Sequence, residues 1–238
     1  MKTKLISIII PAYNERNTIE PIISKILSLN LDSEIIVVDD HSTDGTIEKI
    51  EEIRASNPNI KIIRHDKNLG KGAAIKNGFA AAGGDVAIIQ DADLEYDPND
   101  IPKVIQPILD GYADVVYGSR FAGHPRRALF YWHSLGNKFL TFLSNVFTNL
   151  NLTDMETCYK AFKKIVYKNI KLESKGFAIE PEITCKIARM RQRIYEVPIS
   201  YRGRSYFEGK KINWKDGLVA IFAIIKHSFF SVLLLKSL

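Results

Sequence analysis

Short continuous apolar runs alternate with longer segments of helical periodicity along the first half of the chain. The runs predict strands buried on both sides, and the periodic segments predict amphipathic helices. The strands are expected over residues 5–10, 34–38, 60–64 and 85–90, and the helices over residues 18–29, 44–55 and 70–82. This alternation indicates an α/β fold with a mostly parallel, twisted, Rossmann-like sheet and helices on both faces.

The second half of the chain is predicted to continue this architecture. Strands are expected over residues 113–118, 159–162 and 195–200, and helices over residues 98–109, 129–150, 179–190 and 214–235. No repeat, low-complexity segment or obvious linker divides the chain, so one domain is expected. It comprises residues 1–212, and an apolar C-terminal helix within residues 213–238 is expected to be an element of the same domain.

The charge of the chain narrows the class of its ligands. The formal net charge is +6 and the isoelectric point is near 9.1. Such a basic excess suits anionic partners, namely phosphates, nucleic acid or an acidic membrane face. The two cysteines, Cys158 and Cys185, have no metal-ligand or redox spacing. We therefore expect reduced thiols and a cytoplasmic protein without a signal peptide.

A segment that carries polar residues directly follows each of three predicted strands. Ligands of open α/β sheets bind beyond the carboxyl ends of the strands, so these residues are expected to converge on one ligand. They are Pro11, Ala12, Tyr13, Asn14 and Glu15 after the first strand, Asp39 and Asp40 after the second, and Asp91, Ala92 and Asp93 after the fourth.

The acids after the fourth strand predict a metal site. Alternate residues of an extended segment point the same way, so Asp93 and Glu95 are expected to face one divalent ion, with Asp91 nearby. Mg²⁺ or Mn²⁺ prefers a few carboxylates together with substrate phosphate oxygens. The ion would neutralise a pyrophosphate leaving group. The alternative interpretation is a solvated acidic turn.

Two further segments are candidates for ribose or phosphate contacts. An acid at the end of the second strand often holds a ribose hydroxyl, which favours Asp39, although Asp39 or Asp40 could instead cap the helix that follows. Gly70, Lys71 and Gly72 begin a helix, where backbone amides and the ammonium group can meet an anion. No Walker motif is present, and no G-x-G-x-x-G follows the first strand, which disfavours a dinucleotide dehydrogenase.

Six segments together resemble family 2 glycosyltransferases of the GT-A fold, most closely the polyprenyl-phosphate (dolichol-phosphate) hexose synthases. They are Ile8–Glu15 (IIIPAYNE), Ile35–Gly45 (IIVVDDHSTDG), Asn68–Gly72 (NLGKG), Asp91–Leu94 (DADL), Gly118–Arg120 (GSR) and Thr153–Thr157 (TDMET). The resemblance covers about residues 4–210. It implies an inverting, metal-dependent enzyme that transfers a hexose from a UDP- or GDP-sugar to a dolichyl or undecaprenyl phosphate.

The resemblance also implies roles for individual residues. It makes Asp93 the main metal ligand and Asp91 a donor contact, while Glu95 lies where relatives often carry a glutamine ligand. Arg120, with Arg202 or Arg204, resembles the arginines that handle the donor and acceptor phosphates. The expected nucleotide-sugar-binding residues are Pro11, Ala12, Tyr13, Glu15, Asp39, Lys71, Gly72, Asp91, Ala92, Asp93, Arg202, Arg204 and Lys210.

The acceptor decides whether the enzyme needs a base. A lipid phosphate oxygen is already anionic, so catalysis would rest on positioning and charge stabilisation. A hydroxyl acceptor needs a carboxylate base, for which Asp154 is the first candidate and Glu156 the second. The alternative interpretation of both acids is a helix-end cap or a salt bridge to a neighbouring arginine.

Two apolar and aromatic segments, residues 130–147 and 214–232, bear on membrane binding. Core packing is the ordinary explanation of such stripes. Basic residues nevertheless lie among or beside them, and a basic amphipathic helix can lie in the membrane interface. We therefore predict a peripheral enzyme at the cytoplasmic face. A membrane-spanning helix is not expected, because Lys226, His227 and Ser228 interrupt the last apolar run.

Three competing functions remain open at this level. A related transferase would act on a saccharide hydroxyl in cell-surface polysaccharide synthesis. A sugar nucleotidyltransferase also uses a Rossmann-like sheet and a metal, but its glycine-rich and basic loop is missing after the first strand. A nucleic-acid-binding protein would explain the basic charge but not the acids at the strand ends. Nucleic acid is therefore not expected among the partners.

Overall fold

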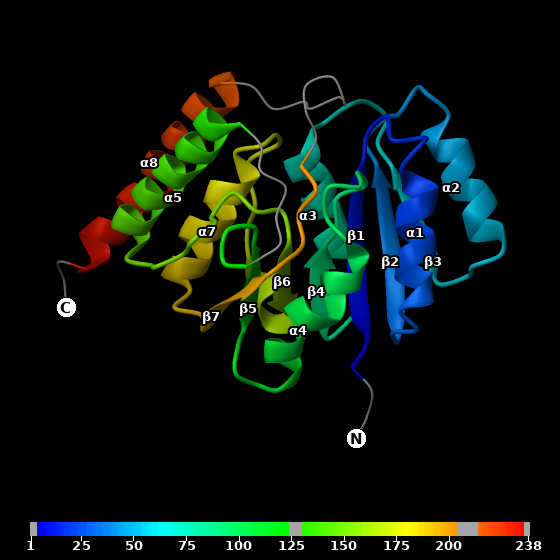
Figure 1. Ribbon diagram of the computed structural model, residues 1–238, viewed down its shortest axis with the longest axis horizontal. Coiled ribbons are helices and arrows are strands. Elements are labelled where there is room, and N and C mark those ends of the chain that lie inside the picture. Colours follow the sequence, from blue (N-terminus) through cyan, green and yellow to red (C-terminus); the bar gives the residue numbers. More distant parts are fainter. Residues whose placement is uncertain (1–3, 124–129, 204–213, 236–238) are drawn as a thin grey trace.

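One mixed sheet runs through the molecule (Figure 1). The computed structural model describes residues 4–123, 130–203 and 214–235. The strands are β1 Ile6–Ala12, β2 Ser33–Asp39, β3 Ile60–Arg64, β4 Val86–Ile89, β5 Val115–Ser119, β6 Lys160–Lys163 and β7 Ile194–Pro198. Their order is β3-β2-β1-β4-β6-β5-β7, and all neighbours are parallel except the two pairs that β6 makes.

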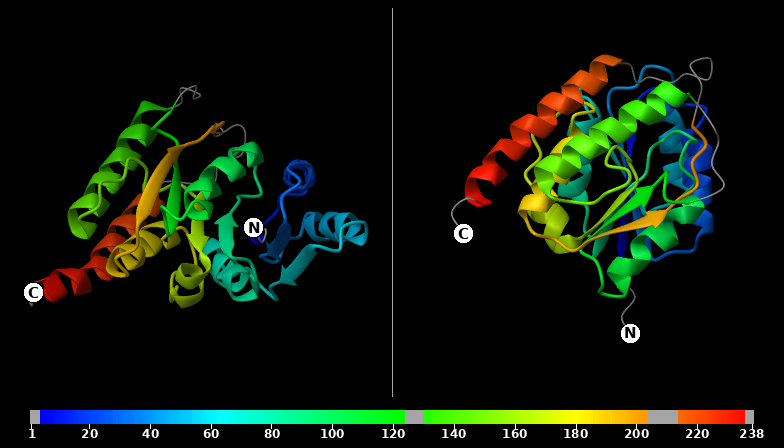
Figure 2. Two further views of the ribbon diagram at one scale, coloured as in Figure 1. Left: turned by 90° about the horizontal axis from the view of Figure 1, so that it is seen from below. Right: turned by 60° about the vertical axis from the view of Figure 1, so that its left-hand side comes forward.

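Helices cover both sides of this sheet, as Figure 2 shows. They are α1 Ile19–Ser28, α2 Thr46–Ala55, α3 Lys71–Ala81, α4 Ile101–Leu109 after the short 3₁₀ turn η1 Pro98–Asp100, α5 Tyr131–Thr148, α6 Lys164–Asn169, α7 Ile179–Arg189 and α8 Trp214–Leu235. The predicted fold class is confirmed. The sequence pattern missed α6 and gave no sign that β6 is antiparallel.

The central strands are buried on both faces, which explains their continuous apolar runs. Ile8, Ile9 and Ile10 are consecutive in β1 and have no exposed surface. Helix α3 packs against β1 so closely that a Cβ atom on Gly78 would lie 2.3 Å from the Cγ2 atom of Ile9. Glycine is therefore required at this position in the helix.

The strand order creates a switch point between β1 and β4. The chain builds β2 and β3 on one side of β1 and then returns to place β4 on the other side. Ligands of open α/β sheets bind at such a point, beyond the carboxyl ends of the strands. The loops that follow β1 and β4 therefore flank the expected site.

Three helices pack together beyond β7. Helix α8 contacts α5 and α7, and α5 contacts α7, so the three form a layer at one end of the sheet (Figure 1). The C-terminal helix thus packs on the rest of the chain. None of the helices in the described ranges is both long enough and apolar enough to cross a membrane.

Candidate functional site

The three predicted strand ends meet at one edge of the sheet. Ala12 pairs in register with Asp39, and the Asp40 amide donates to the Ala12 carbonyl at 2.8 Å. On the other side, the Gln90 amide donates to the Ile9 carbonyl at 2.9 Å. The segments 11–15, 39–40 and 91–93 therefore surround the switch point between β1 and β4, as the strand pattern predicted.

The loop after β1 is tied to the loop after β2. The Asn14 amide donates to Ser42 Oγ at 2.9 Å, and the Thr43 amide donates to Asn14 Oδ1 at 2.9 Å. Asn14 takes a left-handed conformation with a φ of 54°, which asparagine tolerates better than most residues. The Tyr13 side chain is 40% exposed at this edge.

The Asp39 carboxylate is fully buried and already has partners within the protein. Its carboxylate accepts from the Ser42 amide at 3.3 Å and lies 3.5 Å from Arg64 Nε. Its side chain has no exposed surface in this conformation. The expected ribose contact of Asp39 stays a prediction.

Asp40 anchors the loop that leads into α3. Its carboxylate lies 2.6 Å from His65 Nδ1 and accepts from the amides of Leu69 and Gly70, both at 2.7 Å. The alternative interpretation of Asp39 or Asp40 as a helix cap is wrong, because Asp44 itself accepts from the Thr46 amide at 3.0 Å.

The glycine turn at residues 70–72 serves packing in this structure. The Gly72 amide donates to the Lys175 carbonyl at 2.6 Å. A Cβ atom on Gly72 would lie 2.1 Å from the Ser174 carbonyl oxygen. The expectation that the Gly72 amide meets an anion is therefore wrong for this conformation, because a backbone carbonyl already occupies it.

Lys71 pairs with Asp91, the first acid after β4. Its Nζ atom lies 2.9 Å from Asp91 Oδ1, which also accepts from Cys158 Sγ at 2.9 Å. Burial opposes ionisation of Asp91, but the Lys71 charge and these hydrogen bonds outweigh it and hold the pKa of Asp91 below its ordinary value. The cation beside Asp91 is thus Lys71, which leaves Asp91 better suited to a donor contact than to a metal.

The segment from Asp91 to Glu95 is turned and not extended. Asp93 Oδ1 accepts from the Glu95 amide at 3.1 Å, the side-chain-to-backbone contact of an Asx turn. The argument that alternation points Asp93 and Glu95 the same way is therefore wrong. Glu95 Oε2 instead accepts from the Tyr201 hydroxyl at 2.8 Å.

The metal prediction now rests mainly on Asp93. No group of three or more histidine, cysteine or acidic side chains in the described ranges is arranged to hold a metal. Mg²⁺ commonly uses one or two carboxylates and completes its shell with water and substrate phosphates. Asp93, which is partly exposed beside the switch point, fits such a site. The metal role of Asp93 stays a prediction.

Arg120 and Asp154 form a buried, two-pronged ion pair. Arg120 donates from Nε to Asp154 Oδ2 and from Nη2 to Asp154 Oδ1, both at 2.7 Å. Asn137 of α5 accepts from Arg120 Nη2 at 3.2 Å and donates to Asp154 Oδ1 at 3.2 Å. Asp154 has no exposed surface and Arg120 keeps 15%. The structure therefore shows the salt bridge of the alternative interpretation, and a role for Asp154 as a base stays an untested prediction.

Aromatic rings enclose the Arg120 guanidinium. Its Cζ atom lies 5.2 Å from the centre of the Tyr201 ring and 5.7 Å from that of Phe121, within cation–π range. The Arg202 amide donates to the Glu95 carbonyl at 2.8 Å. The segment of Tyr201 and Arg202 therefore links Arg120 to the loop that carries Glu95.

The other basic residues with expected phosphate contacts are Arg202, Arg204 and Lys210. The Arg202 side chain is exposed beside the Tyr201 contact. Arg204 and Lys210, which were expected to bind donor or acceptor phosphates, lie outside the described residues.

Sequence reasoning missed a buried pair beneath the site. Lys160 of β6 has no exposed surface and donates to Glu180 of α7 and to the Thr157 carbonyl. Glu180 Oε1 also lies 3.7 Å from Lys71 Nζ, which connects this pair to Asp91. A lysine inside an otherwise apolar strand was the available signal, because a buried charge requires a partner.

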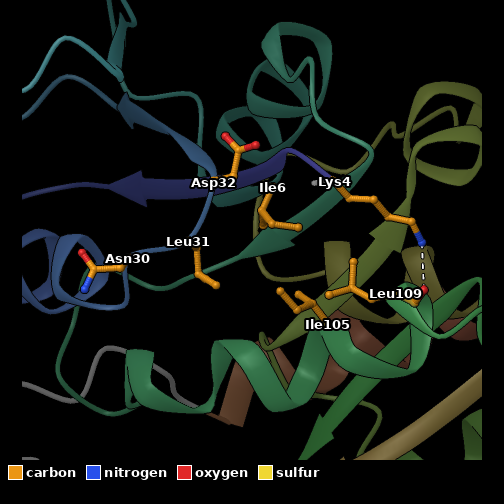
Figure 3. A pocket seen from close by; sticks show the side chains of 7 residues that line it. All are labelled: Lys4, Ile6, Asn30, Leu31, Asp32, Ile105 and Leu109. Atoms are coloured by element: carbon orange, nitrogen blue, oxygen red, sulfur yellow. Dashed lines mark hydrogen bonds between the residues drawn. The ribbon is translucent and has the colours of Figure 1, made fainter. Parts of the chain in front are cut away.

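A separate cavity lies at the amino-terminal ends of the strands, opposite the candidate site (Figure 3). Its volume is about 310 Å³, and its lining is mainly apolar around Ile6, Leu31, Ile105 and Leu109. Lys4 closes one side and donates to the Leu109 carbonyl at 2.9 Å. Ile6 begins β1, so this cavity faces away from the carboxyl ends where the polar residues converge.

Fold and site together define a class, an open α/β sheet whose switch point is flanked by acids and a paired cation. The chain belongs to glycosyl transferase family 2, whose family model matches residues 7–171. The glucosyl-3-phosphoglycerate synthase of Mycobacterium tuberculosis, solved with Mn²⁺, UDP and phosphoglyceric acid, shares the fold with a TM-score of 0.71 and 21% identity. That match covers 94% of this chain and 78% of that chain, and the fold is GT-A.

Three curated relatives are similar in sequence. A dolichol-phosphate mannosyltransferase from Pyrococcus furiosus is 35% identical over 87% of this chain, which spans only 60% of that relative. An undecaprenyl-phosphate mannosyltransferase from Micrococcus luteus is 30% identical over 85% of each chain. A UDP-N-acetylglucosamine–dolichyl-phosphate N-acetylglucosaminyltransferase from Methanococcus voltae is 30% identical over 94% of this chain and 96% of that protein.

Proposed function

We propose that this glycosyltransferase moves a hexose from a UDP- or GDP-sugar to a polyprenyl phosphate, with inversion and with Mg²⁺ or Mn²⁺ as cofactor. The names of the three relatives support this substrate class. Within the chain, the observation that best supports a phosphate acceptor is the position of Arg120. It is held by Asp154 and by Asn137, a residue of the helix whose outer face is apolar and exposed.

The proposed chemistry follows from charges already in place. The acceptor phosphate is an anion, so it attacks the anomeric carbon without a base, and the paired Arg120 guanidinium orients it. Asp93 would hold the divalent ion, which would neutralise charge on the departing diphosphate. Asp154 then holds Arg120 in place, a role that its bidentate contact supports better than proton removal.

The outer face of α5 and α8 supports a lipid acceptor. Core packing was the ordinary explanation of their apolar stripes, but many of these side chains are exposed. They are Tyr131 (70%), Trp132 (76%), Phe139 (53%), Phe142 (62%) and Val146 (62%) on α5 and Leu218 (57%), Val219 (49%) and Phe222 (68%) on α8. Exposed apolar side chains gathered on two packed helices favour an interaction site, and exposed Lys138 and Lys226 suit an anionic lipid surface.

The enzyme is accordingly proposed to bind the cytoplasmic face of a membrane peripherally. The buried free thiols of Cys158 and Cys185 suit a reducing compartment. Flotation with anionic vesicles at moderate salt tests the membrane contact. Phe142→Glu should reduce flotation at least tenfold, whereas Ile165→Glu, at a similarly exposed residue of α6, should not. Equal flotation of both variants would contradict the assignment of this face.

A thermal-shift panel tests the donor half of the proposal. UDP, GDP and their hexose conjugates are added with and without Mn²⁺, because a ligand that binds the native state raises its stability. One nucleotide should give a shift of several degrees that depends on the metal. No shift with any nucleotide would contradict the proposed function.

A further inference from the structure

Three ion pairs surround the centre of the site, and each has its own partner. Lys71 pairs with Asp91, Lys160 pairs with Glu180, and Arg120 pairs with Asp154. Their formal charges cancel. Glu156 is a seventh charged group beside them, and no cation within the described ranges forms an ion pair with it.

The chain places Glu156 between two residues that contact opposite sides of the site, namely Asp154, which pairs with Arg120, and Cys158, whose thiol donates to Asp91. The charges that act on it are those of Glu180 and Lys160, which connect to Lys71, and those of Arg120 and Asp154. Its Oε1 atom is buried and has no hydrogen-bond partner among the described residues, and the same holds for Oε1 of Glu180.

The cost of this arrangement indicates a function. A buried carboxylate oxygen without a partner is destabilising, and natural proteins keep such groups mainly at functional sites. Burial, with the Glu180 charge next, raises the pKa of Glu156 to about 7. About half of the side chains are therefore ionised at neutral pH, and the buried Oε1 atom has no hydrogen-bond donor among the described residues.

We propose that Glu156 accepts a hydrogen bond from a hydroxyl group of the transferred sugar and thereby contributes to sugar selection. The assignment rests on the proposed function. In a single displacement the sugar lies between the departing diphosphate and the attacking phosphate. Glu156 stands in the chain between Cys158 and Asp154, which contact Asp91 and Arg120, the residues assigned to those two sides. A phosphate would be repelled by the ionised carboxylate, whereas sugar hydroxyls are hydrogen-bond donors.

Donor binding measured by calorimetry with Mn²⁺ tests the assignment. The ligands are UDP or GDP alone, the hexose conjugate that the wild-type protein binds best, and the monodeoxy forms of that conjugate. Glu156→Ala should weaken the hexose conjugate about 10- to 100-fold, as expected for a hydrogen bond to a charged group, and change the free nucleotide less than about twofold. Glu52→Gln, an exposed acid on α2, is the matched control and should change neither.

The monodeoxy donors keep the test independent of any folding defect. For the wild-type protein, one deoxy position should cost about the same factor as Glu156→Ala, and the variant should be insensitive to that position. Three results for Glu156→Ala would overturn the assignment. The variant could weaken binding of the nucleotide and of the conjugate equally, or it could leave the binding of both unchanged. It could also lose turnover while it binds the conjugate as the wild-type protein does. Wild-type protein that binds no nucleotide would overturn the proposed function, and this assignment with it.

Discussion

The buried pair of Arg120 and Asp154 has an exposed counterpart, which makes its energy measurable. Arg193 donates to Asp114 with the same two-pronged geometry, at 2.8 Å from Nε and 2.9 Å from Nη2. The side chains of Arg193 and Asp114 are 54% and 15% exposed, against 15% for Arg120 and none for Asp154. Asp154→Asn and Asp114→Asn therefore compare one contact in two environments.

The expected magnitudes differ because of solvent. Removing one partner of a buried pair leaves an uncompensated charge and costs about 3–5 kcal/mol. The same change in an exposed pair costs about 0.2–1 kcal/mol. For a chain of this size, 1 kcal/mol corresponds to roughly 2–4 °C in Tm. Asp154→Asn should therefore lower Tm by about 6 °C or more, and Asp114→Asn by about 4 °C or less.

Urea and thermal unfolding at neutral pH measure both costs, and steady-state kinetics separate the roles of Asp154. If Asp154 positions Arg120, Asp154→Asn should raise KM for the lipid phosphate about tenfold and lower kcat less. Loss of a general base would instead lower kcat by about 10²–10⁴ at unchanged KM. That kinetic result, or equal destabilisation by the two variants, would refute the reasoning.

The other predictions concern stability. The pKa of Glu156 is raised from 4.5 to about 7, so the folded state holds this proton more tightly. Stability should then fall by at most roughly 3 kcal/mol as pH rises from about 4.5 through 7, and Glu156→Gln should abolish that slope in urea titrations; parallel slopes would argue against it. Gly72→Ala should lower Tm by several degrees, because the Cβ atom would meet the Ser174 carbonyl oxygen at 2.1 Å. Gly136→Ala, which meets nothing within 4 Å on α5, should raise stability by about 0.5–1 kcal/mol; a larger loss at Gly136 than at Gly72 would be inconsistent with this packing.

Most of the fold could be predicted because the first half repeats one local pattern. Each buried strand of that half is a mainly apolar run. The helices between these strands were recognised by apolar residues at helical spacing. The antiparallel direction of β6 left no such signal, since its pairing with β4 and β5 depends on residues far away in the chain.

The site could be located from the sequence, but its contacts could not. Strand ends converge by topology, so Asp39 and Asp91 were placed correctly at one edge. Their partners are set by distant loops. The amide of Gly72 is taken by Lys175, and Lys71 reaches Asp91 across the switch point. Pattern arguments also failed where a side chain reshaped the backbone, as in the turn that Asp93 makes with the Glu95 amide.

Transfer of labelled sugar to lipid tests the central claim most directly. The protein is incubated with Mn²⁺, a labelled UDP- or GDP-hexose and vesicles that contain polyprenyl phosphate, and label in the organic extract is counted. The account predicts a lipid-linked hexose that requires the phosphate group of the acceptor and is strongly reduced by Arg120→Met. Label that reaches only a saccharide acceptor, or an equal yield with the unphosphorylated polyprenol, would contradict it.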